Sequence, residues 1–220
     1  MKWIFQLLVA CALSVASSSA VAQEAGAAEA AFELRPMERP SYRPRARWDF
    51  SRNGYLWTRT TMSAVLGHGR PLVEMVPGDI ADWCPAYPTQ DAERRAAFWI
   101  GMISALVKHE STFRPRAVGG GGKWYGLTQI LPATARGYGC RAQSREALKN
   151  GPANLSCAVR IMAVTVPRDG VVALRDGRRA GVAADWGPMV FRAKRTEMQS
   201  FTRKQSYCRL LSSVRPARKP

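Results

Sequence analysis

The sequence predicts a mainly helical domain with a substantial core, on the strength of three observations. Apolar residues recur at helical spacing over long stretches, above all at residues 97–107. No alternation of apolar and polar residues is long enough for a large sheet, and no internal repeat is present. At 220 residues the chain has room for one such domain and extra segments.

Residues 1–22 are typical of an export signal. Lys2 precedes an apolar run at residues 3–15, and Ala20-Val21-Ala22 supplies the small residues at which signal peptidase cuts. The run is interrupted and short for a membrane anchor, so we expect no stable membrane insertion of the mature chain. A lipoprotein anchored through Cys11 is the alternative.

Four cysteines remain after such a cleavage, an even number that suits an oxidising compartment and two disulfides. Of the three possible pairings, we favour Cys140 with Cys157, which closes a short loop, and Cys84 with Cys208, which ties the ends of the domain. Metal binding is the alternative, but no cysteine pair has the spacing of zinc ligands.

The charge predicts an anionic partner or surface. Removal of Lys2 with the signal lowers the formal net charge from +17 to +16. In the cytoplasm such a charge would suggest nucleic acid. An exported, disulfide-bearing chain instead meets anionic lipid headgroups and carboxylated wall peptides, so we expect no nucleic-acid partner. Solubility alone is the simpler explanation.

The mature chain divides into three parts by composition. Residues 23–50 are first Ala/Glu-rich and then Arg/Pro-rich, which predicts a flexible arm. Residues 51–212 carry the apolar patterning of the folded domain, and residues 213–220 form a basic tail. Within the domain, a short helix is expected over residues 56–66, with Gly67-His68-Gly69 as its stop signal.

The clearest helix starts after Asp91, a good N-cap, and has no proline until Pro115. Before it, residues 70–90 are proline-rich and predict a looped connection whose apolar residues pack on the domain. The helix carries one face formed by four residues: Trp99, Ile103, Leu106 and Glu110.

Further helices are expected downstream. Residues 126–135 predict a tight approach into a short helix with Pro132 in its first turn. Another helix is expected over residues 154–164, and a broken one over residues 171–184. A basic amphipathic helix over residues 189–211 should turn three side chains inward: Met198, Phe201 and Leu210.

Glu110 is the candidate catalytic residue. At the end of an apolar helix face it would be partly desolvated, which raises a carboxyl pKa and keeps the group protonated near neutrality. A general acid needs this property. By itself the pattern is weak, because a carboxylate in a last helical turn is most often solvated.

Three segments together resemble a known family. Glu110-Ser111, then Gly126-Leu127 with Gln129-Ile130, then Asn154 before an apolar helix are similar to the signature of soluble lytic transglycosylases, relatives of goose-type lysozyme. The resemblance covers about residues 92–190. It implies a lysozyme-like helical fold with a cleft for peptidoglycan glycan strands and Glu110 as the single catalytic acid. The export signal separately predicts a periplasmic location.

The implied reaction is non-hydrolytic. Glu110 would protonate the β-1,4 oxygen between N-acetylmuramic acid and N-acetylglucosamine while the muramoyl N-acetyl carbonyl supports the oxocarbenium. The resulting carboxylate would then take the proton of the C6 hydroxyl, which closes a 1,6-anhydro ring. No cofactor and no metal is required.

The resemblance also implies substrate-binding residues. Gly126 would let the backbone approach a sugar, beside Leu127; Gln129 and Asn154 could donate to and accept from an N-acetyl group; Ser111 could orient the helix end. Each has a simpler structural explanation: a turn for Gly126, a solvated surface for Gln129, and caps for Asn154 and Ser111.

Two departures from the family pattern concern the surroundings of the acid. Gly119 stands where the family has serine, and Ala184-Asp185-Trp186-Gly187-Pro188 lacks the tyrosine expected to bond the glutamate. Trp186 is either a stacking wall for a sugar or a core residue. Asp185 raises a rival mechanism, in which a second carboxylate activates water for inverting hydrolysis.

The leading prediction is therefore a monomeric periplasmic lytic transglycosylase that acts on glycan strands, possible partners being a secretion or conjugation apparatus. A hydrolytic muramidase on the same fold is the first alternative. A non-catalytic glycan-binding or secretion-accessory protein is the second, and the presence of Glu110 argues against it.

Overall fold

The structure is a computed structural model that describes residues 42–210. The predicted export signal, residues 23–41 of the predicted arm and the predicted tail lie outside the described residues. None of the described helices is long and apolar enough to cross a membrane.

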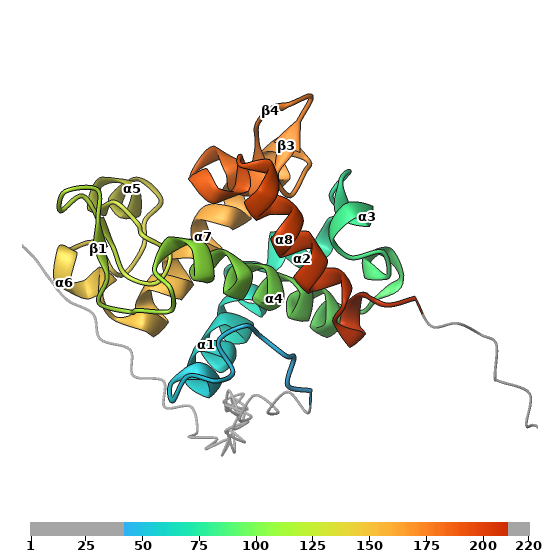
Figure 1. Ribbon diagram of the computed structural model, residues 1–220, viewed down its shortest axis with the longest axis horizontal. Helices are drawn as coiled ribbons and strands as arrows, with labels where there is room; N and C mark the ends of the chain where they lie inside the picture. Colours follow the sequence, from blue (N-terminus) through green and yellow to red (C-terminus); the bar gives the residue numbers. More distant parts are fainter. Residues whose placement is uncertain (1–41, 211–220) are drawn as a thin grey trace, which may run out of the picture. The chain divides into compact units, whose positions relative to one another are not determined.

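Two 19-residue helices form the centre of the domain: α4 (Ala92–Glu110) and α7 (Gly151–Asp169). The 13-residue helix α1 (Gly54–Leu66) packs against both. Residues 96–107 of α4 are all buried, so this helix is enclosed on every side and its apolar residues need not be confined to one face. In Figure 1, α4 runs between α1 on one side and α8 on the other.

Shorter elements enclose this centre. They are the helices α2 (Arg70–Glu74), α3 (Ile80–Trp83), α5 (Pro132–Gly137), α6 (Arg145–Leu148) and α8 (Arg192–Arg203), and the 3₁₀ turns η1 (Tyr87–Thr89), η2 (Gly181–Ala184), η3 (Gly187–Met189) and η4 (Ser206–Cys208). Two antiparallel strand pairs complete the described fold, β1 (Val118–Gly119) with β2 (Trp124–Tyr125) and β3 (Leu174–Arg175) with β4 (Arg178–Arg179). The predicted mainly helical class is confirmed.

The start of the long helix was predicted correctly. Asp91 is the N-cap of α4, and its Oδ1 accepts a hydrogen bond of 2.8 Å from the backbone N–H of Arg94. Pro132 occupies the first turn of α5, where its missing N–H has no partner to lose. Helix α7 is longer than predicted at both ends, because Asn150 caps it and Pro167 is accommodated near its end.

The flexible arm predicted through residue 50 is wrong for residues 42–50. Trp48 is fully buried, and its ring lies edge-on to that of Trp57 with centroids 5.9 Å apart. Its indole N–H donates to Thr58 Oγ1 at 2.9 Å, and the backbone N–H of Arg47 donates to Ser104 Oγ at 2.8 Å. The buried ring of Trp48 thus packs residues 42–50 against the domain, although their Arg/Pro-rich composition is typical of a flexible segment.

The broken helix predicted over residues 171–184 is also wrong, because residues 174–179 form a hairpin. Its turn is Asp176-Gly177, and both residues have positive φ, 50° and 75°. An Asp-Gly pair in this conformation is a strong signal for a two-residue hairpin. The partly apolar composition of the stretch obscured that signal.

Two smaller corrections concern the neighbouring segments. Residues 70–90 contain α2, α3 and η1 instead of a simple loop, although Leu72 and Trp83 are buried as predicted. Helix α8 ends at Arg203, so Leu210 is 66% exposed and does not face inward, whereas Met198 is fully buried.

Both disulfides have the predicted pairing. Cys84 is bonded to Cys208 across 124 residues of sequence, and Cys140 to Cys157 across 17. The first ties the end of α3 to η4, and the second ties the chain after α5 to α7. Their oxidised state rules out a zinc site built from these four cysteines.

The two disulfides should contribute unequally to stability. Loop-closure entropy predicts about 4.7 kcal/mol for a loop of about 100 residues and about 3 kcal/mol for one of about 15. We expect Cys84→Ala/Cys208→Ala to lower the free energy of unfolding by about 1 to 2 kcal/mol more than Cys140→Ala/Cys157→Ala. Urea unfolding of the two double variants measures this, and an equal or reversed order would contradict it.

Candidate active site

Glu110 is the last residue of α4 and is half-buried. The three residues that precede it on the predicted face, Trp99, Ile103 and Leu106, are fully buried. The helix stops there because Thr112 and Phe113 adopt left-handed conformations, with φ of 50° and 60°. The carboxyl group therefore lies at the boundary between the core and the surface, as the sequence predicted.

The electrostatic surroundings of Glu110 are simple. Burial raises its pKa from the usual 4.5 to about 7, and the positive charge of Lys194 on α8 partly opposes this rise. No hydrogen bond from another described residue contributes to the shift. The carboxyl group is thus about half protonated at neutral pH and has its hydrogen-bonding capacity available for a ligand.

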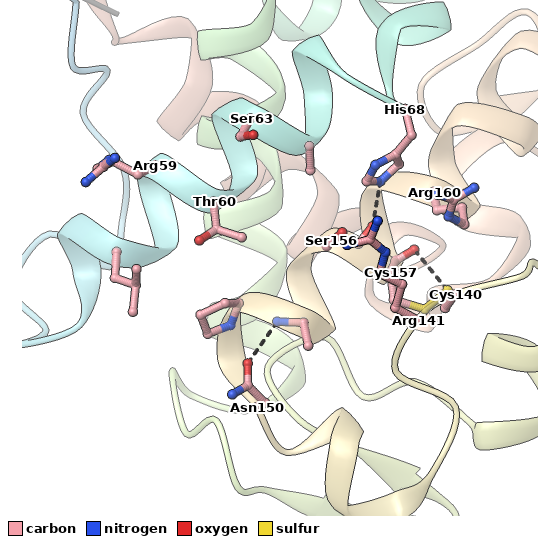
Figure 2. Close-up of a pocket in the computed structure, with 14 residues that line it drawn as sticks. Arg59, Thr60, Ser63, His68, Cys140, Arg141, Asn150, Ser156, Cys157 and Arg160 are labelled. Atoms are coloured by element: carbon pink, nitrogen blue, oxygen red, sulfur yellow. Dashed lines mark hydrogen bonds between the residues drawn. A yellow bond between two sulfur atoms is a disulfide. The ribbon is translucent and has the colours of Figure 1, made fainter. Parts of the chain in front are cut away.

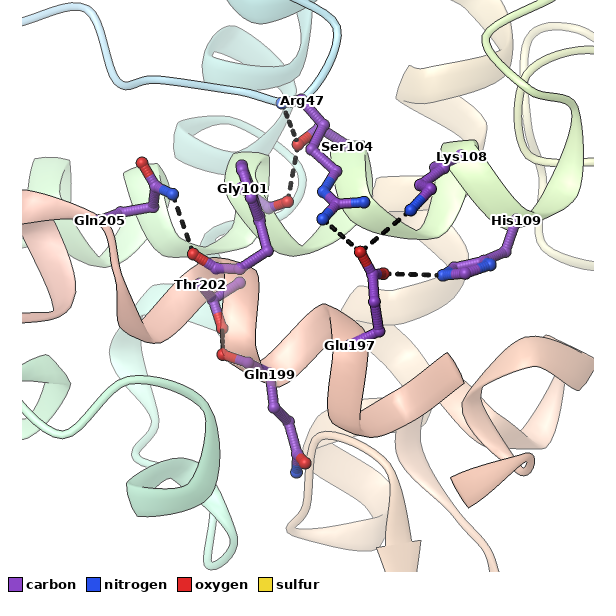
Figure 3. Close-up of polar contacts among 10 residues, drawn as sticks. Arg47, Gly101, Ser104, Lys108, His109, Glu197, Gln199, Thr202 and Gln205 are labelled. Carbon is purple, nitrogen blue, oxygen red and sulfur yellow. Dashed lines mark hydrogen bonds and ion pairs between the residues drawn. The ribbon is translucent and has the colours of Figure 1, made fainter. Parts of the chain in front are cut away.

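A four-residue ion cluster connects α8 to the end of α4 (Figure 3). Glu197 of α8 accepts from His109 Nε2 at 2.9 Å and from Lys108 Nζ at 3.1 Å, and it pairs with Arg47. Burial alone would raise the pKa of Glu197, but the contacts with His109, Lys108 and Arg47 hold it below its usual value. Because Lys194 lies one turn earlier on α8, the cluster also determines where Lys194 stands relative to Glu110.

Position 126 requires a glycine, both for its backbone conformation and because neighbouring atoms leave no room for a side chain. Its φ is +83°, and an added Cβ would lie 2.1 Å from Leu148 O and 2.4 Å from Asn154 Nδ2. Its backbone N–H donates to Ala117 O at 2.9 Å. Close packing against α6 and α7, not open space for a sugar, therefore explains the glycine.

Asn154 holds the loop over residues 125–128 against α7. It is fully buried; its Oδ1 accepts from the backbone N–H and the hydroxyl of Thr128, at 2.9 and 2.7 Å. Its Nδ2 donates to Tyr125 O and Leu148 O, both at 3.0 Å. The amide thus uses its full capacity of two donors and two acceptor positions inside the protein. A direct contact with substrate is not available to it in this arrangement.

Gln129 is half-buried with a positive φ of 51°. Its Nε2 donates to Gly126 O at 2.8 Å and to Ala117 O at 3.2 Å, which joins the two ends of the hairpin that contains β1 and β2. A Cβ at Gly119 would lie 2.3 Å from Gln129 Oε1. The departure from the family pattern at Gly119 therefore makes room for the Gln129 side chain.

The remaining predicted binding residues are buried. Ser111, Leu127 and Trp186 are 2%, 0% and 3% exposed. The indole N–H of Trp186 donates to Thr128 O at 2.8 Å, so this ring is a core residue and not a stacking wall for a sugar. Of the seven predicted residues, only Glu110 and Gln129 are partly accessible, and the other five build the frame around them.

Asp185 does not form a pair with Glu110. Burial raises the pKa of Asp185, and its charged neighbours are Arg168, Arg179 and Asp169. It makes no contribution to the pKa of Glu110, which depends on burial and Lys194. Different charged residues therefore act on the pKa of each of the two carboxyl groups.

Two accessible aromatic groups, one on α8 and one on the hairpin of β1 and β2, were not predicted from the sequence. Phe191 is 62% exposed on the α8 side, with Lys194 Nζ 5.5 Å from its ring centroid. On the hairpin side, Trp124 is 45% exposed and its ring lies against the backbone of Gly120. Exposed aromatic rings of this kind offer flat surfaces for ligands. Their only shared sequence signal was an aromatic residue next to a basic one, Lys123 or Arg192, which is weak.

Comparison with known proteins gives a consistent result. Residues 88–170, which run from η1 through α7, match the family model of the transglycosylase SLT domain. No curated protein sequence matches the chain. Among solved structures, wild-type Bd0314 DslA and two of its glutamate-to-glutamine variants superpose with a TM-score of 0.70 at 27% sequence identity, covering 77% of this chain and 100% of theirs.

The matched segment contains Glu110 at the end of α4. It also contains Gly126 and Gln129, which follow β2, and Asn154 on α7, which bonds the loop over residues 125–128. The family resemblance rests on these positions, and Gly126, Gln129 and Asn154 come together at the loop over residues 125–129. Residues 88–170 are therefore similar to an SLT-type transglycosylase domain, and the described chain has a lysozyme-like helical fold.

Proposed function

We propose that this protein is a lytic transglycosylase that cleaves the β-1,4 bond between N-acetylmuramic acid and N-acetylglucosamine in peptidoglycan. The observation that carries the proposal is Glu110, a half-buried carboxyl group with a pKa of about 7 and no hydrogen-bonding partner among the described residues. A lone carboxyl group whose pKa lies near the working pH is protonated in about half of the molecules and can serve as a general acid. The SLT-type fold supports a glycan substrate.

In the first step, the Glu110 carboxyl donates its proton to the glycosidic oxygen, and the bond from the anomeric carbon to that oxygen breaks. The substrate's own N-acetyl oxygen supports the positive charge that develops on the sugar, which makes a second protein carboxylate unnecessary. Lys194 stabilises the carboxylate left on Glu110, because its charge favours the ionised form.

In the second step, the Glu110 carboxylate accepts the proton of the C6 hydroxyl. The C6 oxygen bonds to the anomeric carbon, and a 1,6-anhydromuramoyl end is the product. Glu110 is then protonated again, so the cycle consumes neither water nor a cofactor. The exposed rings of Trp124 and Phe191 offer surfaces for neighbouring sugars.

The alternatives differ in what they require of the site. A hydrolytic muramidase needs a group that activates water; Asp185 has Arg168, Arg179 and Asp169 as its charged neighbours and is not among the groups that shift the pKa of Glu110. A non-catalytic glycan-binding protein would not need an acid with a raised pKa. A periplasmic location, a monomeric state and a role beside a secretion or conjugation apparatus remain predictions from the sequence.

The product ends distinguish these functions. Digestion of purified peptidoglycan by the mature protein should yield anhydromuramoyl ends, identified by mass spectrometry. Glu110→Gln should lower the rate by about a hundredfold or more, because it removes the general acid. Glu93→Gln, the same change at the other end of α4, is the matched control and should retain activity. Reducing ends would favour hydrolysis, and undiminished activity of Glu110→Gln would refute the role of Glu110.

The pKa of Glu110 predicts the pH dependence of the reaction. The acid must be protonated at the start, so the rate should fall as pH rises through about 7, by roughly tenfold per pH unit above it. A rate that is constant between pH 6 and 9 would contradict this assignment.

Folding stability offers an independent check, since the native pKa of Glu110 is raised above its usual 4.5. Below pH 4.5 both the native and the unfolded state hold the proton, so there is no destabilisation. Between 4.5 and about 7 only the native state holds it, and stability falls with rising pH. Glu110→Gln should therefore gain about 1 to 3 kcal/mol relative to wild type between pH 4 and pH 8.

Lys194 should control the alkaline limit of activity. Lys194→Gln removes the charge that lowers the pKa of Glu110, so the alkaline limb of the rate profile should move upward by roughly half a pH unit to one unit. Lys204→Gln, at the end of the same helix, is the matched control and should leave the profile in place. A downward shift, or equal shifts in both variants, would exclude the proposed interaction.

A further inference from the structure

A second concave site lies between α1 and α7, and none of the candidate active-site residues lines it. The cavity has a volume of about 680 Å³, within the range of sites that hold small ligands. Its α7 side is formed by residues spaced three and four apart on one face of that helix: Ala153, Ser156, Cys157 and Arg160. Its α1 side carries the hydroxyl groups of Thr60 and Ser63 between the apolar side chains of Leu56 and Ala64.

The lining of this cavity is cationic. Three arginines, Arg59, Arg141 and Arg160, border it together with His68, and no aspartate or glutamate does. Within residues 42–210, none of these guanidinium groups forms an ion pair with a carboxylate. Three arginines gathered without an anionic partner repel each other, and an anionic ligand would relieve that repulsion.

The cations stand at the two ends of the cavity (Figure 2). Arg59 lies at one end, and Arg141 and Arg160 lie with His68 at the other, with Thr60 and Ser63 on α1 between the ends. His68 Nε2 is 3.0 Å from Ser156 O, which anchors the ring to α7. The Cys140–Cys157 disulfide holds Arg141, the residue after Cys140, beside α7. The disulfide therefore organises the more cationic end.

This arrangement fits an extended ligand with more than one anionic group. Guanidinium groups bind carboxylates through paired hydrogen bonds, and the hydroxyl groups between the ends can bond the amides of a peptide. A single small anion would occupy only one end. Peptidoglycan carries short peptides with several free carboxylates next to its glycan strands, so such a ligand is supplied by the proposed substrate itself.

We propose that the cavity between α1 and α7 binds the carboxylate-bearing peptide stems of peptidoglycan, with Arg141 and Arg160 at one end and Arg59 at the other. This inference rests on the proposed function, because the peptide is part of that substrate. The glycan strand is processed at Glu110, and the peptide site retains the enzyme on strands that still carry their stems.

The test measures binding of a soluble wall tetrapeptide to the mature protein by calorimetry, without any need for catalysis. Arg141→Gln/Arg160→Gln should weaken binding at least about tenfold, since it removes two charge-assisted contacts. Arg175→Gln/Arg178→Gln, which removes the same charge from the exposed β3–β4 hairpin, is the matched control and should bind like wild type. The tetrapeptide with amidated carboxylates should bind at least about tenfold more weakly than the free acid.

Several results would overturn the inference: no tetrapeptide binding, equal loss in both double variants, or equal binding of the amidated peptide. Tighter binding of inorganic phosphate that the tetrapeptide does not displace would also refute a peptide site. If Arg141→Gln/Arg160→Gln does not fold, Arg59→Gln provides the same test at the other end of the cavity. Cleavage of glycan strands stripped of peptides tests the proposed function separately, since it needs Glu110 and not this cavity.

Discussion

The complete enclosure of α4 is the constraint on which the rest of this structure depends. Twelve successive residues of this helix, 96–107, are buried, so other elements must cover it on every side. Helices α1, α2 and α8 and the turns η1, η3 and η4 all contact it. Enclosure also determines the chemistry, because it delivers Glu110 to the edge of a water-poor core and raises its pKa to about 7.

Polar contacts then fix what surrounds the helix end. On one side, Asn154 bonds the loop over residues 125–128 from inside the core, and Gly126 permits the close approach that these bonds need. On the other side, Glu197 joins α8 to Lys108 and His109. Neither set of contacts includes a hydrogen bond to Glu110, so within the described residues its carboxyl group keeps its hydrogen-bonding capacity for a ligand.

Several residues that were expected to touch substrate have this supporting role instead. Asn154 and Trp186 satisfy their polar atoms within the protein, at Thr128 and its neighbours. A motif identifies which residues occur together in a family, but burial decides which of them a ligand can reach. The accessible groups, Trp124, Phe191 and Lys194, lie at positions that the motif does not include.

The sequence by itself determined the helical class, the cap at Asp91 and the position of Glu110, because periodicity and capping are local signals. It favoured both disulfide pairs among three possible pairings, and the structure has these pairs. It did not reveal that Trp48 is a core residue, that residues 174–179 form a hairpin, or that Lys194 acts on Glu110. Only the tertiary structure decided these, because each depends on which distant segment packs against the residue. The cationic cavity between α1 and α7 belongs to the same group, since Arg59, Arg141 and Arg160 come together only through that packing.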